Sequence, residues 1–253
     1  MPYPGAKTVH RALSLLKAFT DEHPTWTMTE LATQAGISRP TVHRLLATLE
    51  GEGFITKVPR STRYRLGPEA IVLGARALRA INLRDVAHRE LESIAGATGE
   101  DISLDILVGL DVLVIDEIRG QNILGLASSI GTRWPAHATA TGKVLLAFSS
   151  TPQAVTTRKL ERFTYKTLTN WNDLSQALED IRNQGYATNI EELEMGFVAL
   201  AAPIRDREGN AAAAIGLGGS AHRIGEQRIP GLVALLCQAG ERVSRLLGYS
   251  QNP

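Results

Sequence analysis

The sequence has a single cysteine, few aromatic residues and no apolar run long enough to span a membrane. Cys237 stands alone among 253 residues, which excludes an intramolecular disulfide framework and a cage of thiolate metal ligands. The longest uncharged apolar run covers residues 211–221, whereas a transmembrane helix needs about 20 residues. We therefore expect a cytoplasmic protein without a signal peptide or a membrane segment.

Residues with catalytic or ligating chemistry show no spacing typical of an active site. The six histidines are scattered along the chain, so no metal site is expected. Gly142-Lys143 lacks the earlier glycine of a phosphate-binding loop, because His137 occupies that position. Gly216-Leu217-Gly218 lacks the third glycine of a dinucleotide-binding turn, because Ala221 stands there. We expect no catalytic residue, no metal and no cofactor, and an enzyme is the least favoured class.

Charge is distributed unevenly along the chain. Residues 1–67 hold nine Lys/Arg and five Asp/Glu, a net charge of +4, while the remainder holds 18 basic and 21 acidic residues, a net charge of −3. Hydrophobic residues make up 43% of the chain, and its length suits two domains. A small basic part joined to a mildly acidic body is typical of a polyanion binder with a second function, although an excess of four charges alone is also compatible with chance.

The N-terminal part carries the spacing of a helix-turn-helix. A first helix is expected from Thr8, and Thr27 with Glu30 forms a capping box that opens a second helix ending at Gly36. Ser38 caps a third helix with Pro40 in its first turn. Small, glycine and branched apolar residues stand where two crossing helices need them, at Ala32, Gly36, Val42 and Leu45. The alternative is an ordinary helical hairpin inside a core.

After Gly53 the apolar period changes from 3.6 to 2, which predicts two strands with a basic turn. Phe54, Thr56 and Val58 are expected to face one way, together with Tyr64 and Leu66. Two strands after a recognition helix indicate a winged helix-turn-helix that binds DNA. The expected contact residues are Ser38, Arg39, Pro40, Thr41, His43 and Arg44 on the third helix and Arg60, Arg63 and Arg65 on the wing. A solvated surface charge is the alternative interpretation for Arg65.

A connecting helix and a mixed α/β body follow the wing. The helix from about Glu69 to Ile81 has a wide apolar surface, which favours pairing with a second copy over packing on its own domain. Further helices are expected near residues 139–148, 152–161, 173–184 (capped by Asn172) and 226–247, and strands near 101–108, 111–119, 186–189, 197–206 and 210–218.

Two separate stretches resemble one family of bacterial transcription factors, the IclR (isocitrate lyase regulator) type. The DNA-binding half is similar at residues 41–49, 53–54 and 64–67, and the C-terminal half at residues 135–143 and 201–206. The resemblance covers residues 8–248 and implies an α+β protein: a winged helix-turn-helix (1–67), a linker or dimerisation helix (68–82) and a GAF-like mixed α/β effector-binding domain (83–253). It also implies a homodimer or a dimer of dimers.

The resemblance also points to a small-molecule pocket. Backbone N–H groups of Ala140 and Thr141 open a helix and suit an anion. This chain departs from residues common in the family at four positions: Asn189 keeps a polar group, whereas Ala199, Gly216 and Gly218 remove hydrogen-bonding side chains and free volume. This predicts an enlarged pocket for an aromatic carboxylate or a related amide. The other expected lining residues are Leu126, Trp134, His137, Met195 and Phe197, although plain core packing is an alternative for Trp134, Met195 and Phe197.

The sequence thus predicts a DNA-binding transcriptional regulator that binds double-stranded operator DNA under the control of a small organic effector. We favour a repressor, although no residue distinguishes repression from activation. The alternative is a DNA-binding protein whose C-terminal domain only oligomerises.

Overall fold

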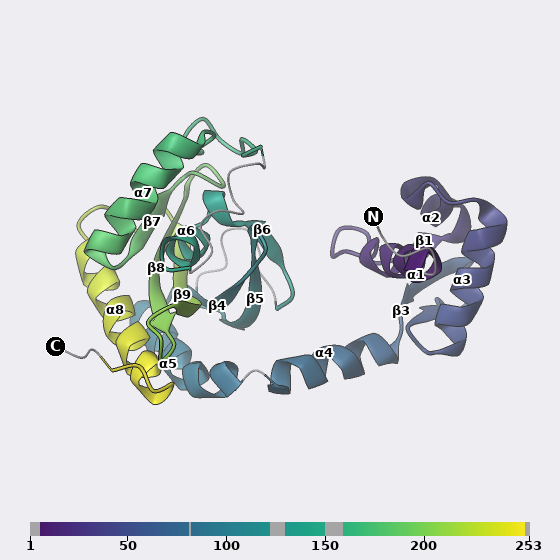
Figure 1. Cartoon of the computed structure of the whole chain (residues 1–253), viewed down its shortest axis with the longest axis horizontal. Coiled ribbons are helices and arrows are strands. Elements are labelled where there is room, and N and C mark those ends of the chain that lie inside the picture. The colour runs from purple at the N-terminus through teal and green to yellow at the C-terminus, as the bar shows by residue number, and fades with distance from the viewer. Residues whose placement is uncertain (1–5, 81, 122–129, 150–158, 251–253) are drawn as a thin grey trace. The chain divides into compact units, whose positions relative to one another are not determined.

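The computed structural model describes residues 6–80, 82–121, 130–149 and 159–250, and the chain divides into two compact units, Met1–Ala80 and Ile81–Pro253. The first unit contains α1 (Ala6–Lys17), β1 (Trp26–Thr27), α2 (Met28–Ala35), α3 (Arg39–Gly51), β2 (Ile55–Lys57), β3 (Arg63–Leu66) and α4 (Pro68–Ala80), as Figure 1 shows. Within the described residues, no helix is long and apolar enough to cross a membrane.

The first unit is a winged helix-turn-helix. Its three strands form one antiparallel sheet in the order β1-β3-β2. Fully buried Leu15 of α1, Leu31 of α2 and Leu46 of α3 meet in one core, on which Phe54 and Tyr64 also pack. Because the three helices share a single apolar core, the outer face of α3 is held rigidly toward solvent.

The turn between α2 and α3 has the expected chemistry. Thr27 and Glu30 form both bonds of the capping box, and Gly36 adopts the left-handed conformation, with φ of 63°. A residue with a Cβ is strained at that φ. Ser38 stands at the N-cap of α3, but its side chain does not cap a backbone amide; its Oγ lies 2.9 Å from Thr41 Oγ1 instead.

Two expectations for this unit were wrong in detail. The first helix is already helical at Ala6, so Thr8 lies inside it rather than at its cap. In the wing, Ile55 is the fully buried strand residue, whereas Leu66 is 45% exposed. The inward-facing positions of the wing differ from the expected ones because Phe54 still belongs to the turn after α3. There the Phe54 N–H donates to the Leu49 carbonyl at 2.9 Å.

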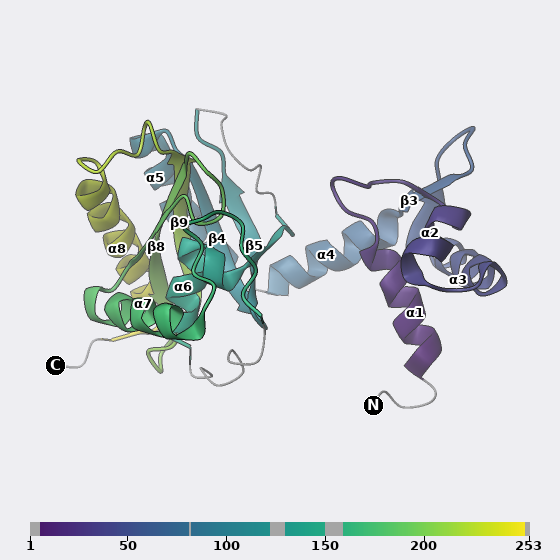
Figure 2. The same ribbon diagram turned by 90° about the horizontal axis from the view of Figure 1, so that it is seen from above.

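The second unit is a six-stranded antiparallel sheet covered by helices on both faces (Figure 2). The strands run in the order β6-β5-β4-β9-β8-β7, so β4 and β9 lie at the centre. The elements are α5 (Asn82–Thr98), β4 (Asp101–Val108), β5 (Asp111–Ile118), β6 (Arg133–Pro135), the 3-10 helix η1 (Ala136–Ala138), α6 (Ala140–Ala147), α7 (Trp171–Gln184), β7 (Ala187–Ile190), β8 (Phe197–Arg205), β9 (Ala211–Ser220) and α8 (Ile229–Leu246).

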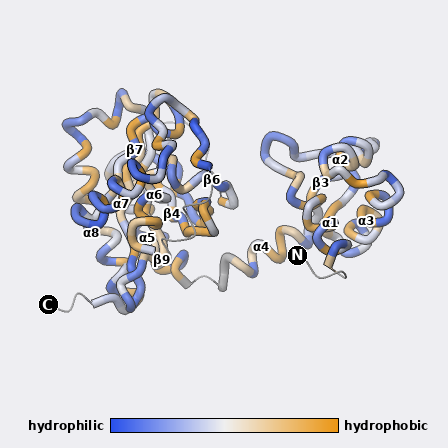
Figure 3. The backbone as a smooth tube through the Cα atoms, turned by 45° about the horizontal axis from the view of Figure 1, so that its top comes forward, coloured by the Kyte–Doolittle hydropathy of each residue, from blue (hydrophilic) through white to orange (hydrophobic). Residues whose placement is uncertain are grey.

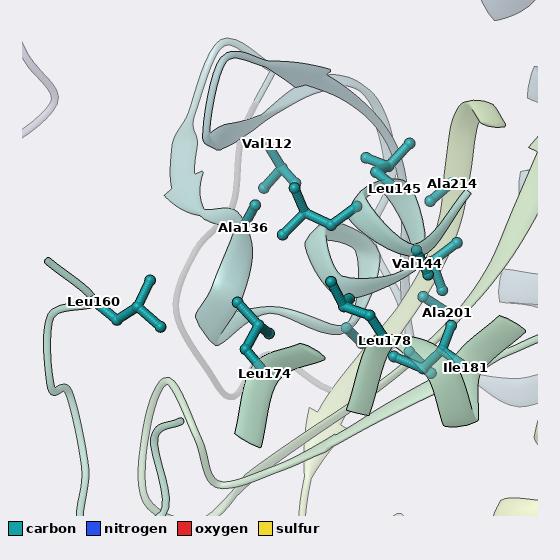
Figure 4. Close-up of a cluster of buried hydrophobic side chains, with 14 residues drawn as sticks. Val112, Ala136, Val144, Leu145, Leu160, Leu174, Leu178, Ile181, Ala201 and Ala214 are labelled. Carbon is teal, nitrogen blue, oxygen red and sulfur yellow. The ribbon is translucent and has the colours of Figure 1, made fainter. Parts of the chain in front are cut away.

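Helices α6 and α7 pack together on one face of this sheet, and α5 packs with α8 on the other. The core between α6, α7 and the sheet is shown in Figure 4, where Val144 and Leu145 lie beside Ala201 and Ala214. Small alanines on β8 and β9 let α6 approach the sheet closely, and this places the N-terminus of α6 over the central strands.

The mixed α+β architecture is thus confirmed, with local corrections. Asn170 rather than Asn172 caps α7, because its Oδ1 accepts the Asp173 N–H at 2.9 Å. Residues 159–161 at the end of the expected helix over 152–161 are not helical, and most of that range lies outside the described residues.

Candidate DNA interface and ligand cavity

The N-terminal end of α3 presents a polar surface to solvent. Val42, Leu45, Leu46 and Leu49 are buried, as the helical period predicts. Ser38, Arg39, Pro40, His43 and Arg44 are exposed, and Thr41 is half-buried. The Ser38–Thr41 contact orders two hydroxyls at the first turn. This surface therefore carries two cations, an imidazole and two hydroxyls on one rigid helix, which suits contacts to base edges and phosphates in a major groove.

The three wing arginines differ in their surroundings. Arg60 and Arg65 are exposed. Arg63 is half-buried, and its guanidinium donates to Glu30 Oε1 at 2.9 Å and to the Thr25 carbonyl at 3.1 Å. Arg63 thus joins the wing to α2, whereas the other two leave their charges in solvent.

A cavity of about 90 Å³ opens beside the N-terminus of α6, over β4, β8 and β9. Seven of the residues expected from the sequence line it: Trp134, Ala140, Thr141, Phe197, Ala199, Gly216 and Gly218. Thr139 caps α6 by accepting the Gly142 N–H at 3.1 Å. Thr139, Ala140 and Thr141 at the start of α6 line this cavity. The first-turn N–H groups that Thr139 does not cap are therefore available to donate to an acceptor on a ligand.

Three other expected pocket residues do not line this cavity. His137 Nε2 lies 2.9 Å from the Glu161 carbonyl oxygen, so it holds a neighbouring segment. Asn189 is buried, donating to the Ala138 carbonyl and accepting the Glu192 N–H, and this leaves its amide engaged within the protein. Met195 is 49% exposed. Leu126 lies outside the described residues.

The glycines at 216 and 218 do not enlarge the cavity, which corrects the sequence-based expectation. A Cβ on Gly218 would stand 2.6 Å from the Phe197 ring, and one on Gly216 would stand 2.7 Å from Thr141 Cγ2 and 2.9 Å from Ser103 Oγ. Neighbouring side chains therefore occupy the space that the absent side chains leave, so these glycines accommodate the protein's own packing.

Acidic residues of the cavity wall escaped the sequence analysis. Asp101, Asp105 and Glu117 all line it, together with Ser103. Asp105 is only 4% exposed, and burial raises its pKa to about 6, against the lowering effect of hydrogen bonds from Thr141 and Ser103. The alternation of Asp101, Ser103 and Asp105 on one strand was a readable signal, because residues two apart share a face.

Lys143 and Cys237 are held in surroundings that suit a structural role. Lys143 is buried, and its Nζ donates to the Thr188 carbonyl at 2.9 Å and forms an ion pair with Glu192. Burial raises the pKa of the Cys237 thiol, as expected of an unreactive cysteine. Among the described residues no cluster of His, Cys, Asp and Glu is suited to a metal ion.

Comparison with known proteins gives matches in both units. Residues 8–66 match the IclR helix-turn-helix domain, and residues 75–245 match the bacterial transcriptional regulator IclR C-terminal family. The chain is 34% identical over 251 residues to the HTH-type transcriptional regulator XynR of Escherichia coli K12, covering 97% of this chain and 99% of XynR. It is 30% identical over 247 residues to the transcriptional repressor IclR of the same organism, covering 96% and 90% of the two chains.

A solved structure shows the same fold over nearly the whole chain. It is that of an IclR homologue from Microbacterium hydrocarbonoxydans complexed with 4-hydroxybenzoate. The two share 23% sequence identity with a TM-score of 0.85, covering 96% of this chain and all of the other. XynR and IclR are a transcriptional regulator and a transcriptional repressor rather than enzymes.

Proposed function

Because this chain belongs to the IclR family of bacterial DNA-binding transcriptional regulators, we propose that it is a repressor whose affinity for a pseudo-palindromic operator is set by a small organic effector. The observation that carries the DNA half of this proposal is the rigid, polar N-terminal face of α3. The wing and the cavity at α6 support the rest. Such a protein would work in the cytoplasm.

Within the DNA unit, proximity to the helix start assigns the roles. Base edges are reached by Ser38, Arg39, Thr41 and His43, and Arg39 pairs with a guanine through two hydrogen bonds. Pro40 lies between them in the first turn, and Arg44 holds a phosphate. On the wing, Arg60 and Arg65 supply phosphate or minor-groove contacts, while Arg63 contributes to them only from its place against Glu30.

Pairing of two copies provides enough contacts for a specific site. Apolar residues recur along α4 in Figure 3, and Ile71 and Leu73 are 74% and 46% exposed. An apolar helix surface of this kind suits a homodimer, or a dimer of dimers, with residues 68–82 as the dimerisation helix between units 1–67 and 83–253. Two recognition helices then read half-sites about one helical turn apart, or a multiple of it.

The effector of this proposal is a compact, flat molecule, an aromatic carboxylate or a related amide. The aromatic side chains of Phe197 and Trp134 line the cavity. Backbone N–H groups at the N-terminus of α6 can donate hydrogen bonds to a carboxylate or carbonyl oxygen. A protein of the same fold has been crystallised with 4-hydroxybenzoate, so hydroxybenzoates belong among the first compounds tested.

Selection of duplexes from a random pool by the full chain tests the DNA half. The expected result is enrichment of an inverted repeat, and the absence of any symmetric motif would overturn it. Thermal melting against carboxylates, aromatic acids and amides tests the effector half, because a ligand of the native state raises the midpoint. A chain that selects an operator but shows no melting shift would instead favour a C-terminal domain that only oligomerises.

A further inference from the structure

The cavity wall is acidic and holds one carboxylate that differs from the others. None of the described lining residues is Lys, Arg or His. Asp101 Oδ1 accepts the Gly120 N–H at 2.7 Å, and Glu117 lies 3.7 Å from Arg119 in an ion pair. Asp105 is buried, and among the described residues nothing hydrogen-bonds its Oδ1. One acceptor atom in the cavity is therefore left for a ligand.

The position of Asp105 follows from the sheet. It stands on β4 directly after a break in register between Leu104 and Asp105, and Ser103, two residues earlier, faces Gly216 across the β4–β9 pair. Ser103 and Thr141 line the same cavity, and their side chains oppose the raising of the Asp105 pKa by burial. The absence of a Cβ at Gly216 lets the Ser103 and Thr141 side chains come together at this point.

A buried carboxylate oxygen that accepts no hydrogen bond is costly, because burial removes the water that would solvate it. When ionised it accepts hydrogen bonds and donates none. Its stabilisation therefore requires an N–H or O–H donor, and a second anion placed beside it would be repelled by Asp105 and by Glu117. The cavity thus combines amide donors at the start of α6 with an acceptor on β4.

We propose that Asp105 is a specificity residue of the effector cavity, and that it selects effectors whose buried polar end carries a hydrogen-bond donor, an amide or an ammonium group, over effectors that end in a carboxylate. This inference rests on the proposed effector-binding function and narrows it. A primary amide satisfies both sides of the cavity, because its oxygen accepts from the N-terminus of α6 while its NH2 group donates to Asp105.

Calorimetry on the full chain at pH 8 with matched ligand pairs tests this proposal. Benzamide against benzoate, and propionamide against propionate, keep the size and change only the polar end; benzylamine separates a cationic donor from a neutral one. The native chain should bind the amide of a pair roughly tenfold or more tightly than the carboxylate, the range of a hydrogen bond to a charged group. This comparison needs no variant, so it does not depend on how a substitution folds.

The variant Asp105→Asn then tests whether Asp105 causes the preference for amides over carboxylates. It keeps the size of the side chain, removes its charge and adds an N–H donor, so the preference for the amide should disappear or reverse. Asp111→Asn, which removes a carboxylate from the same sheet outside the cavity, should leave the preference unchanged.

Three results would overturn the inference: tighter binding of the carboxylates by the native chain, an unchanged preference in Asp105→Asn, or no binding of any probe. These measurements also distinguish failure of the inference about Asp105 from failure of the proposed function. A carboxylate that bound best and altered operator affinity would support effector control while removing the role of Asp105. Operator binding in the absence of any probe binding would leave only the DNA half standing.

Discussion

The guanidinium of Arg63 on β3 lies 2.9 Å from the carboxylate of Glu30 on α2, and that same Glu30 accepts the Thr27 N–H at 2.7 Å in the capping box. One carboxylate thus joins the wing to the start of the helix-turn-helix. The backbone hydrogen bond from Thr27, followed by contacts with Arg63, holds the pKa of Glu30 below its ordinary value.

Arg63→Ala should therefore lower the thermal midpoint of the DNA-binding unit as well as its affinity for DNA. Arg60→Ala is the matched control, because Arg60 is exposed on the same wing. It should weaken DNA binding and leave the midpoint unchanged. Equal midpoints for the two variants would show that the Arg63–Glu30 pair does not hold the wing.

The first turn of α3 should carry the sequence preference. Arg39→Ala is expected to narrow the difference between specific and non-specific binding free energies by ~1–3 kcal/mol. Arg44→Ala should weaken both duplexes alike and reduce the salt dependence, since it loses a phosphate contact. Competition titrations with an enriched and a scrambled duplex measure both effects. Equal weakening by Arg39→Ala would assign Arg39 to the phosphates as well.

Gly218 should tolerate no larger residue while Phe197 is present. Gly218→Ala places a Cβ 2.6 Å from the ring, and overpacking of this kind costs about 1–3 kcal/mol of unfolding free energy. Phe197→Leu in the same chain should recover part of the loss. Gly225→Ala is the control, because a Cβ there meets nothing within 4 Å. Urea unfolding measures all three, and an unaffected Gly218→Ala would show that the ring moves freely.

Asp105 should make stability fall as pH rises. Burial raises its pKa in the folded chain from 3.8 to about 6, so the native state binds the proton more tightly than the unfolded state. The resulting stabilisation is complete below about pH 4 and is lost through pH 6. One pKa unit is worth about 1.4 kcal/mol, and the loss therefore approaches roughly 3 kcal/mol.

Urea unfolding of the native chain and of Asp105→Asn between pH 4 and pH 8 measures this effect. The other titratable groups among the described residues of the cavity wall, Asp101 and Glu117, are present in both proteins, so their effects largely cancel in the difference. The native chain should lose stability relative to Asp105→Asn as the pH rises. A difference independent of pH would mean that Asp105 is solvated or paired in the folded protein.

Local patterns predicted the DNA-binding unit well. The inward positions of Val42 and Leu45 follow from the 3.6-residue period, and the left-handed turn follows from Gly36. The Arg63–Glu30 pair could not be foreseen in the same way, because it joins residues 33 positions apart whose proximity depends on how the wing folds back.

The cavity was harder to predict, because its shape depends on pairings between distant strands. Gly218 pairs with Ala199 across β8 and β9, and only this register shows that the Phe197 ring fills the neighbouring space. Asp105 was overlooked because an acidic residue on a strand is ordinarily assigned to the solvent face. Its burial becomes evident only when α6 covers the central strands.

Fluorescence anisotropy gives the affinity of the full chain for an enriched duplex and for a scrambled one, each with and without benzamide. The enriched duplex should bind at least about a thousandfold more tightly, and benzamide should change this affinity about fivefold or more. Benzamide should leave the DNA affinity of Asp105→Asn unchanged. Equal affinity for the two duplexes would contradict sequence-specific regulation by this protein.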